Sequence, residues 1–81
     1  MTVRLDTGVV RLDGDCAVED AETLLALLLD QPAAAIDLAQ CTRLHLAVVQ
    51  VLLVAHRPIA APPGDPFLRD FIVPVLARLP E

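Results

Sequence analysis

The chain has 81 residues, of which 56% are hydrophobic, and a formal net charge of −5 at neutral pH. Its basic residues are six scattered arginines with no lysine. Binding to nucleic-acid phosphates or to an anionic membrane surface requires clustered positive charge, so both functions are excluded.

The length indicates one small domain spanning residues 1–81, and such a domain buries only a modest fraction of its surface. With so many hydrophobic residues, we expect part of the apolar surface to be covered by another chain. No apolar run reaches the about 20 residues that a membrane span requires, so we expect no membrane insertion. The first residues, MTVRLDTG, lack the apolar core of a signal peptide, and we expect a cytoplasmic location in which Cys16 and Cys41 stay reduced.

The N-terminal third predicts a hairpin followed by a helix. Residues 2–5 and 9–12 alternate weakly in hydrophobicity around Asp6-Thr7-Gly8, which is typical of a tight turn. Asp13-Gly14-Asp15 is predicted as a turn, and a helix is predicted over residues 18–29, with acidic residues in its first turns. Its helical spacing predicts a core stripe of Ala21, Leu24, Leu25 and Leu28.

The centre of the chain predicts a buried strand over 34–38, a polar turn over 39–43 and an apolar helix over 44–55. Five helix residues can reach the sheet: Leu44, Val48, Val49, Leu52 and Leu53. The opposite side carries Leu46, Ala47, Gln50, Val51 and Val54. Because both sides of this helix are apolar, we expect the second side to be covered by a partner. We expect Ile36, Leu38, Leu25, Leu28, Leu52 and Leu53 to be among the most buried residues.

The C-terminal third predicts a poor strand over 57–61, restricted by Pro58, and then a helix. Asp65-Pro66 has the preferred order for the cap and first position of a helix, and Pro74 should kink it. The apolar side of this helix should contain Phe67, Leu68, Phe71, Ile72, Val75, Leu76 and Leu79. The order of elements predicts an α/β fold with a small mixed four-stranded sheet, built from the hairpin and two βαβ crossovers.

The central unit resembles the core of the STAS family, the sulphate-transporter and anti-sigma-factor-antagonist domains. Ile36-Asp37-Leu38 is similar to the family's strand end, Val49, Leu52 and Leu53 match its apolar helix positions, and Leu12-Asp13-Gly14-Asp15 resembles its "L-x-G" strand end. The resemblance covers about residues 3–79. It implies three helices mainly on one face of the sheet, in a minimal version of a family whose members usually continue with a further strand and helix.

The resemblance also implies a partner-binding region, because the start of this helix and the preceding turn face the partner in STAS domains. His45 stands at the family's Asp, Leu46 at its phosphorylatable Ser or Thr, and Val48 at its Gly. Leu46 has no hydroxyl, so the family's phosphorylation switch does not carry over. Together with the apolar outer side, this gives the predicted partner-binding residues Thr42, His45, Leu46, Ala47, Gln50, Val51 and Val54.

No catalytic, cofactor or metal site is predicted. Cys41 and His45 have a possible ligand spacing, but no third or fourth ligand is evident, and a cysteine nucleophile would also need an orienting group and an oxyanion pocket. Asp37 is predicted to cap a turn. Cys16 and Cys41 are interpreted as small buried hydrophobic residues.

Three functions are compatible with these observations. The first is a non-catalytic, bacterial-type regulatory module, similar to anti-sigma-factor antagonists, that binds a kinase-like or anti-sigma-like protein. The second is an accessory cytoplasmic subunit of a lipid-transport ABC complex, with the ATPase as partner. The third is a small cysteine enzyme that uses Cys41. A homodimer is compatible with the outer apolar side of the central helix.

Overall fold

The computed structural model describes residues 2–78, and Leu79 of the predicted apolar stripe lies outside them. The elements are β1 (Val3–Asp6), β2 (Val9–Leu12), β3 (Gly14–Cys16), α1 (Asp20–Asp30), β4 (Ala35–Asp37), β5 (Cys41–Leu44), α2 (Leu46–Ala55), β6 (Ile59–Ala61), the π-helical η1 (Leu68–Ile72) and α3 (Val73–Arg78).

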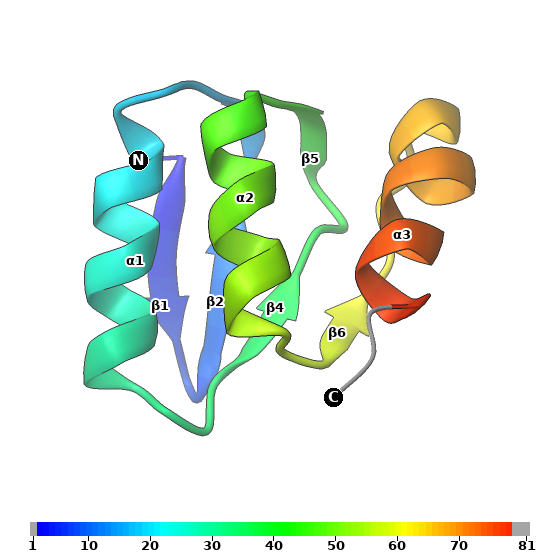
Figure 1. Cartoon of the computed structure of the whole chain (residues 1–81). Helices are drawn as coiled ribbons and strands as arrows, with labels where there is room; N and C mark the ends of the chain where they lie inside the picture. Colours follow the sequence, from blue (N-terminus) through cyan, green and yellow to red (C-terminus); the bar gives the residue numbers. More distant parts are fainter. Residues whose placement is uncertain (1, 79–81) are drawn as a thin grey trace.

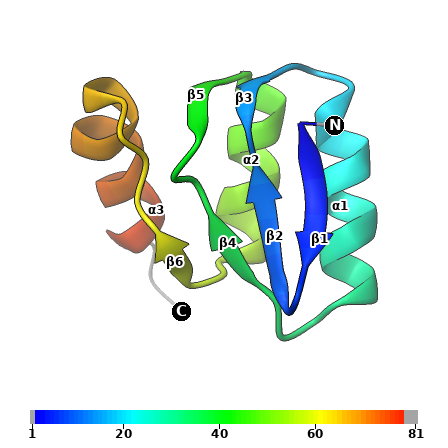
Figure 2. The ribbon, with the colours of Figure 1, turned by 180° about the vertical axis from the view of Figure 1, so that it is seen from behind.

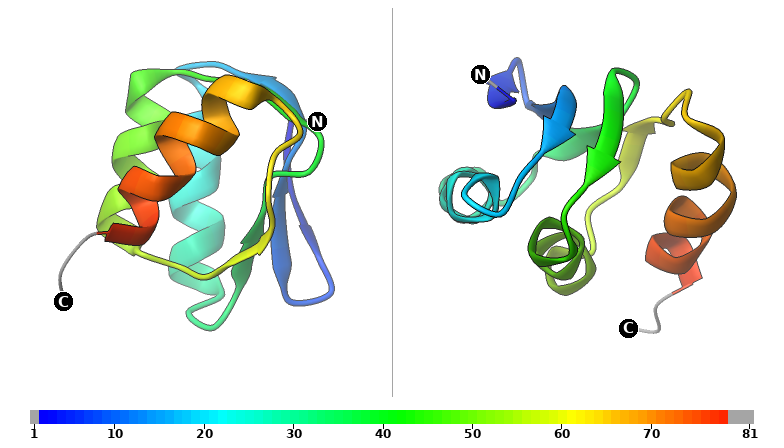
Figure 3. Two further views of the ribbon diagram at one scale, coloured as in Figure 1. Left: turned by 90° about the vertical axis from the view of Figure 1, so that its right-hand side faces the viewer. Right: turned by 90° about the horizontal axis from the view of Figure 1, so that it is seen from above.

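The main sheet has the strand order β1-β2-β4-β6. Strands β1 and β2 form the predicted antiparallel hairpin, and β2, β4 and β6 run parallel. Helices α1 and α2 cover one face of the sheet, and α3 lies beyond β6 (Figures 1 and 3). The fold is therefore a small mixed α/β sheet with three helices, and its predicted hairpin and two parallel crossovers are confirmed.

The opposite face of the sheet is covered by no helix of residues 2–78 (Figure 2). Arg4 and Arg11 lie directly opposite each other in the β1–β2 register. Their charges are balanced by ion pairs from Arg4 to Asp13 at 3.2 Å and from Arg11 to Asp6 and Asp37 at 3.4 and 3.6 Å. Surface pairs of this kind contribute little stability, although Arg11 and Asp37 are partly buried, and they give this face a polar surface suited to water.

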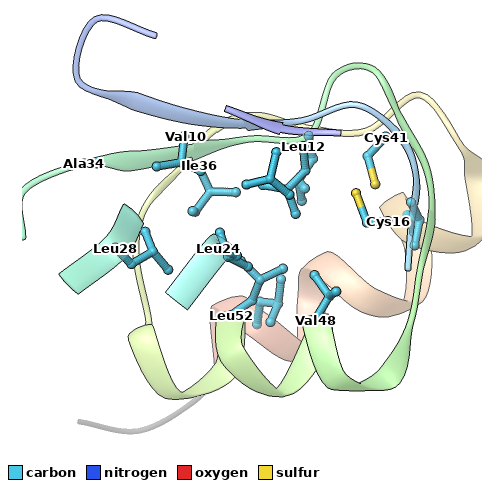
Figure 4. Packing of buried hydrophobic residues seen from close by; sticks show 14 residues of the cluster. Val10, Leu12, Cys16, Leu24, Leu28, Ala34, Ile36, Cys41, Val48 and Leu52 are labelled. Atoms are coloured by element: carbon cyan, nitrogen blue, oxygen red, sulfur yellow. The ribbon is translucent and has the colours of Figure 1, made fainter. Parts of the chain in front are cut away.

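The core lies between the sheet and the inner sides of α1 and α2 (Figure 4). Ile36, Leu38, Leu28 and Leu52 are buried, as predicted. The prediction for Leu25 is wrong, since 45% of this residue is exposed, and Leu53 is only partly buried. Leu24 and Leu28 occupy the inward positions of α1, and Leu25 lies about 100° away from Leu24 around the helix.

Two segments predicted as turns form short strands instead. Strands β3 and β5 pair in parallel as a second, two-stranded sheet, with a register shift between Gly14 and Asp15. The predicted turn remains only at residues 39–40, where the Asp37 carboxylate accepts a hydrogen bond from the Ala39 N–H at 2.9 Å. The capping role predicted for Asp37 is thereby confirmed.

Helix α2 begins two residues later than predicted. His45 has an extended backbone, and its Nδ1 accepts a hydrogen bond from the Ala47 N–H at 3.0 Å, which caps the helix. Leu44 therefore belongs to β5 rather than to the helix. Val48 and Leu52 are the inward residues of α2.

The C-terminal helix is capped as predicted, because the Asp65 carboxylate accepts a hydrogen bond from the Leu68 N–H at 3.1 Å. The π-helical turn η1 ends two residues before Pro74, and the Val73 N–H donates to the Leu68 carbonyl. Pro74 cannot donate to the carbonyl four residues earlier and its ring would clash there, which accounts for the widened turn. Leu68 and Leu76 are buried, whereas the predicted apolar residues Phe67, Phe71 and Val75 are exposed.

Arg57 joins the end of α1 to the loop after α2. Its guanidinium donates to the carbonyl oxygens of Leu28, Gln31 and Ala34 at 2.8, 2.9 and 3.0 Å. Carbonyls at the end of a helix lack partners within the helix, and a cation there also interacts favourably with the helix dipole. A residue 26 positions beyond Gln31 thus fixes the C-terminal end of α1.

Candidate functional site

An apolar groove of about 560 Å³ runs between α1 and α2 on the side away from the sheet. Its lining residues are Ala21, Leu25, Leu28, Leu29, Ala47, Gln50, Val51, Val54, Ala55 and Arg57. Leu29 and Val54 are 74% and 86% exposed, which is unusual for large aliphatic side chains side by side on a small domain. Leu46, 67% exposed, extends the same side of α2, because it precedes Gln50 by four positions.

We call this surface the α1–α2 face. It consists of Leu25, Leu29, Leu46, Ala47, Gln50, Val51 and Val54.

Charge is distributed unevenly around the α1–α2 face. Helix α2 contains no charged residue from Leu46 to Ala55. Helix α1 carries only acidic charges, at Asp20, Glu22 and Asp30. The guanidinium of Arg57 lies at the groove but is engaged by three carbonyl oxygens. The centre of the face is therefore neutral and apolar, and its α1 side is acidic.

The structure brings together four of the predicted partner-binding residues: Ala47, Gln50, Val51 and Val54 line the groove. Val51 also packs against the core. Leu46 adjoins the groove, and His45 caps the same helix.

Thr42 is exposed on β5 and lines a different hollow, of about 310 Å³, with Phe67 and Ile72 near the C-terminal helix. It does not line the groove between α1 and α2.

Leu25 and Leu29 on α1 are the part of the face that sequence reasoning missed. The segment Leu24 to Leu29 contains five leucines, so its pattern does not show which of them face inward. The sequence nevertheless indicated that some of these leucines would be exposed. Five leucines in six positions extend around more of a helix than one buried side can accommodate.

Cys16 and Cys41 lie at the end of the core next to the β3–β5 sheet, and their sulfur atoms point toward each other (Figure 4). Both residues are buried and reduced. The pKa of Cys16 is raised by its hydrogen bond with Cys41 and by burial. The Cys41 Sγ donates to the Arg43 carbonyl at 3.6 Å, and the His45 Nδ1 is already used by the Ala47 N–H. Among residues 2–78 no hydrogen bond joins Cys41 to His45.

Within residues 2–78 no group of three or more His, Cys, Asp or Glu side chains is arranged to hold a metal ion. None of the helices described is long and apolar enough to cross a membrane.

Comparison of the chain with protein-family models, characterised proteins and solved structures gave no match.

Proposed function

We propose that this protein is a regulatory protein-binding module of the STAS type, acting in the cytoplasm without catalysis, and that it binds through the α1–α2 face. The observation that supports the proposal is the groove of about 560 Å³ between two helices, bordered by the exposed Leu29 and Val54. Exposed apolar surface of this kind marks sites of protein interaction.

The chemistry of the face suits a protein partner with an apolar helix or ridge. The groove lies between the exposed side chains of two neighbouring helices, and helices pack by placing the side-chain ridges of one in the grooves of another. Covering Leu29 and Val54 would remove two large aliphatic side chains from water, each worth about 1.5–3 kcal/mol when fully buried. Gln50 is the polar residue on the α2 side of the face, and its amide can fix the orientation of a partner.

The regulatory character rests on the resemblance of residues 34–55 to STAS domains. In that family the start of the corresponding helix is phosphorylated, whereas here Leu46 lacks a hydroxyl. We therefore propose that binding is not interrupted by phosphorylation at the start of α2. The partner class that follows is a kinase-like or anti-sigma-like protein, and a transporter ATPase is the alternative within the same family.

Photo-cross-linking in the native cell tests the proposal. A p-benzoyl-phenylalanine residue in place of Val54 should give a discrete cross-linked protein, because this side chain is exposed at the border of the groove. The same probe in place of Arg4, on the uncovered face of the sheet, is the control and should give none. Mass spectrometry of the product distinguishes a kinase-like partner from an ATPase. If position 54 yields no protein adduct, the α1–α2 face is not a binding site and the proposal fails.

A further inference from the structure

We infer that the α1–α2 face is occupied by a second copy of this chain, related by a two-fold axis over Gln50, so that the two α2 helices pack antiparallel. The inference rests on the proposed function, since the second copy would cover the same face when the proposed kinase-like, anti-sigma-like or ATPase partner is absent. Three features of the face support it: the spacing of the outward residues of α2, the hydrogen-bonding groups of Gln50 and the distribution of charge. The size of the surface sets the strength of the contact.

The outward residues of α2 are arranged symmetrically about Gln50. Leu46 and Val54 are each four positions from Gln50, which corresponds to about 6 Å along the helix axis in opposite directions. In an antiparallel pair with its axis over Gln50, Leu46 of each copy lies opposite Val54 of the other. Gln50 then lies opposite its own copy. A two-fold contact requires this kind of self-complementary surface.

Pairing of two copies also gives a hydrogen-bond partner to the Gln50 amide, which lies midway between Leu46 and Val54 on α2. The Gln50 side chain is exposed, and an apolar partner would leave its amide unpaired in the contact. A glutamine amide contains both donors and an acceptor, so two amides across a two-fold axis can hydrogen-bond to each other. An identical copy supplies the complementary group at that position.

Charge selects α2 over α1 as the place where the copies meet. Each chain carries a net charge of −5, so two copies repel each other unless they meet through a neutral region. Helix α2 is uncharged throughout, whereas an axis over α1 would bring Glu22 and Asp30 of both copies together. Like charges brought together in an interface cost several kcal/mol.

The size of the face indicates a weak dimer. Helix α2 has 10 residues and is therefore about 15 Å long. Stable interfaces bury about 800 Å² per partner, roughly a sixth of this chain's surface of 4866 Å². A contact between two such short helices is smaller than this, so we expect a weak dimer that dissociates in the micromolar range, about 1–100 µM.

Sedimentation velocity of the purified chain from about 1 µM to about 1 mM tests the self-association directly. The wild type should shift from monomer to dimer, and Val54→Asp should remain monomeric because it places charges in the contact. Val54 is 86% exposed, so this variant should keep the melting temperature of the wild type. The matched control is Phe71→Asp, which removes an apolar side chain of similar exposure, 63%, from the C-terminal helix and should still dimerise.

Cysteine cross-linking tests the position of the axis. Gln50→Cys should give a disulfide-linked dimer under mild oxidation, and the wild type, whose two cysteines are buried, should not. Leu46→Cys alone should not cross-link, since its two copies would lie about 12 Å apart along the helices, beyond the about 7 Å between Cα atoms that a disulfide spans. A mixture of Leu46→Cys and Val54→Cys chains should cross-link to a heterodimer.

Two outcomes overturn the inference. One is a wild type that remains monomeric at about 1 mM. The other is a dimer in which Leu46→Cys links to itself as readily as Gln50→Cys does, which would rule out an axis over Gln50. If the photo-cross-link from position 54 reaches a different protein while the purified chain is monomeric, the inference fails and the proposed function stands. If position 54 reaches no protein, the proposed function fails as well.

Discussion

Arg57 gives the most direct test of how this fold is held together. Its guanidinium is the shared donor for three carbonyl oxygens, of Leu28, Gln31 and Ala34, at 2.8–3.0 Å. These contacts join the end of α1 to the loop after α2, so they also fix one end of the groove between the two helices. We predict that Arg57→Ala destabilises the domain strongly and that Arg57→Lys does so by a smaller amount.

The magnitude follows from the number and kind of the bonds. A hydrogen bond to a charged group contributes about 1.5–3 kcal/mol. The three bonds share one side chain that is only partly buried, so their contributions are not additive and water replaces part of the loss. We expect a net loss of about 2–4 kcal/mol for Arg57→Ala. A domain of this length has a total stability of about 4–12 kcal/mol.

The lysine variant retains the charge but not the planar fork of donors that reaches three carbonyls at once. It should recover about half of the loss, leaving about 1–2 kcal/mol.

Urea unfolding and thermal melting followed by circular dichroism measure these values. Arg57→Ala should lower the melting temperature by about 8–32 °C, at about 4–8 °C per kcal/mol for a domain of this size. Arg43→Ala, which removes an exposed arginine from β5, is the control and should change stability by less than about 0.5 kcal/mol. If Arg57→Ala melts within about 3 °C of the wild type, the end of α1 is held by packing alone and the reasoning is refuted.

Three further predictions concern phosphorylation, the core and the thiols. After incubation with an anti-sigma-type kinase and ATP, mass spectrometry should find no phosphate at the start of α2, because Leu46 has no hydroxyl. Stoichiometric phosphate on Thr42 would show that the phosphorylation site has moved to β5. Leu52→Ala should lower the free energy of unfolding, measured in urea, by about 2–5 kcal/mol, because Leu52 is only 4% exposed. A melting temperature within about 2 °C of the wild type would contradict its place in the core. Because its hydrogen bond with Cys41 and burial raise the pKa of Cys16, this thiol should be alkylated by iodoacetamide at pH 8 only after unfolding. Mass spectrometry of the labelled peptides separates it from Cys41, whose pKa the same hydrogen bond lowers, and rapid labelling of Cys16 in the folded protein would contradict the prediction.

The elements that local chemistry determines were predictable from the sequence. Alternation around Asp6-Thr7-Gly8 predicted the hairpin, and Asp65-Pro66 predicted the start of the last helix, because turn and cap preferences act over a few residues. The outward position of Val54 and Gln50 also followed from the sequence, since helical periodicity places them opposite Val48 and Leu52.

Other features depended on groups that are far apart in the chain. Strands β3 and β5 have turn-like sequences, and only their pairing with each other makes them strands. Arg57 has no signal as a helix cap in its own neighbourhood, because its acceptors lie 23–29 positions earlier.

On the α1 side of the candidate site, too, the sequence determined the helix and the tertiary structure determined which of its residues are exposed. The sequence of α1 determined that it would be an apolar helix, but five leucines between Leu24 and Leu29 left its rotation open. Packing against the sheet placed Leu24 and Leu28 in the core and turned Leu25 and Leu29 toward the groove. A helix apolar on several sides has nearly equal ways to bury itself. The shape of the surface that it meets selects one of them, and that surface exists only in the folded chain.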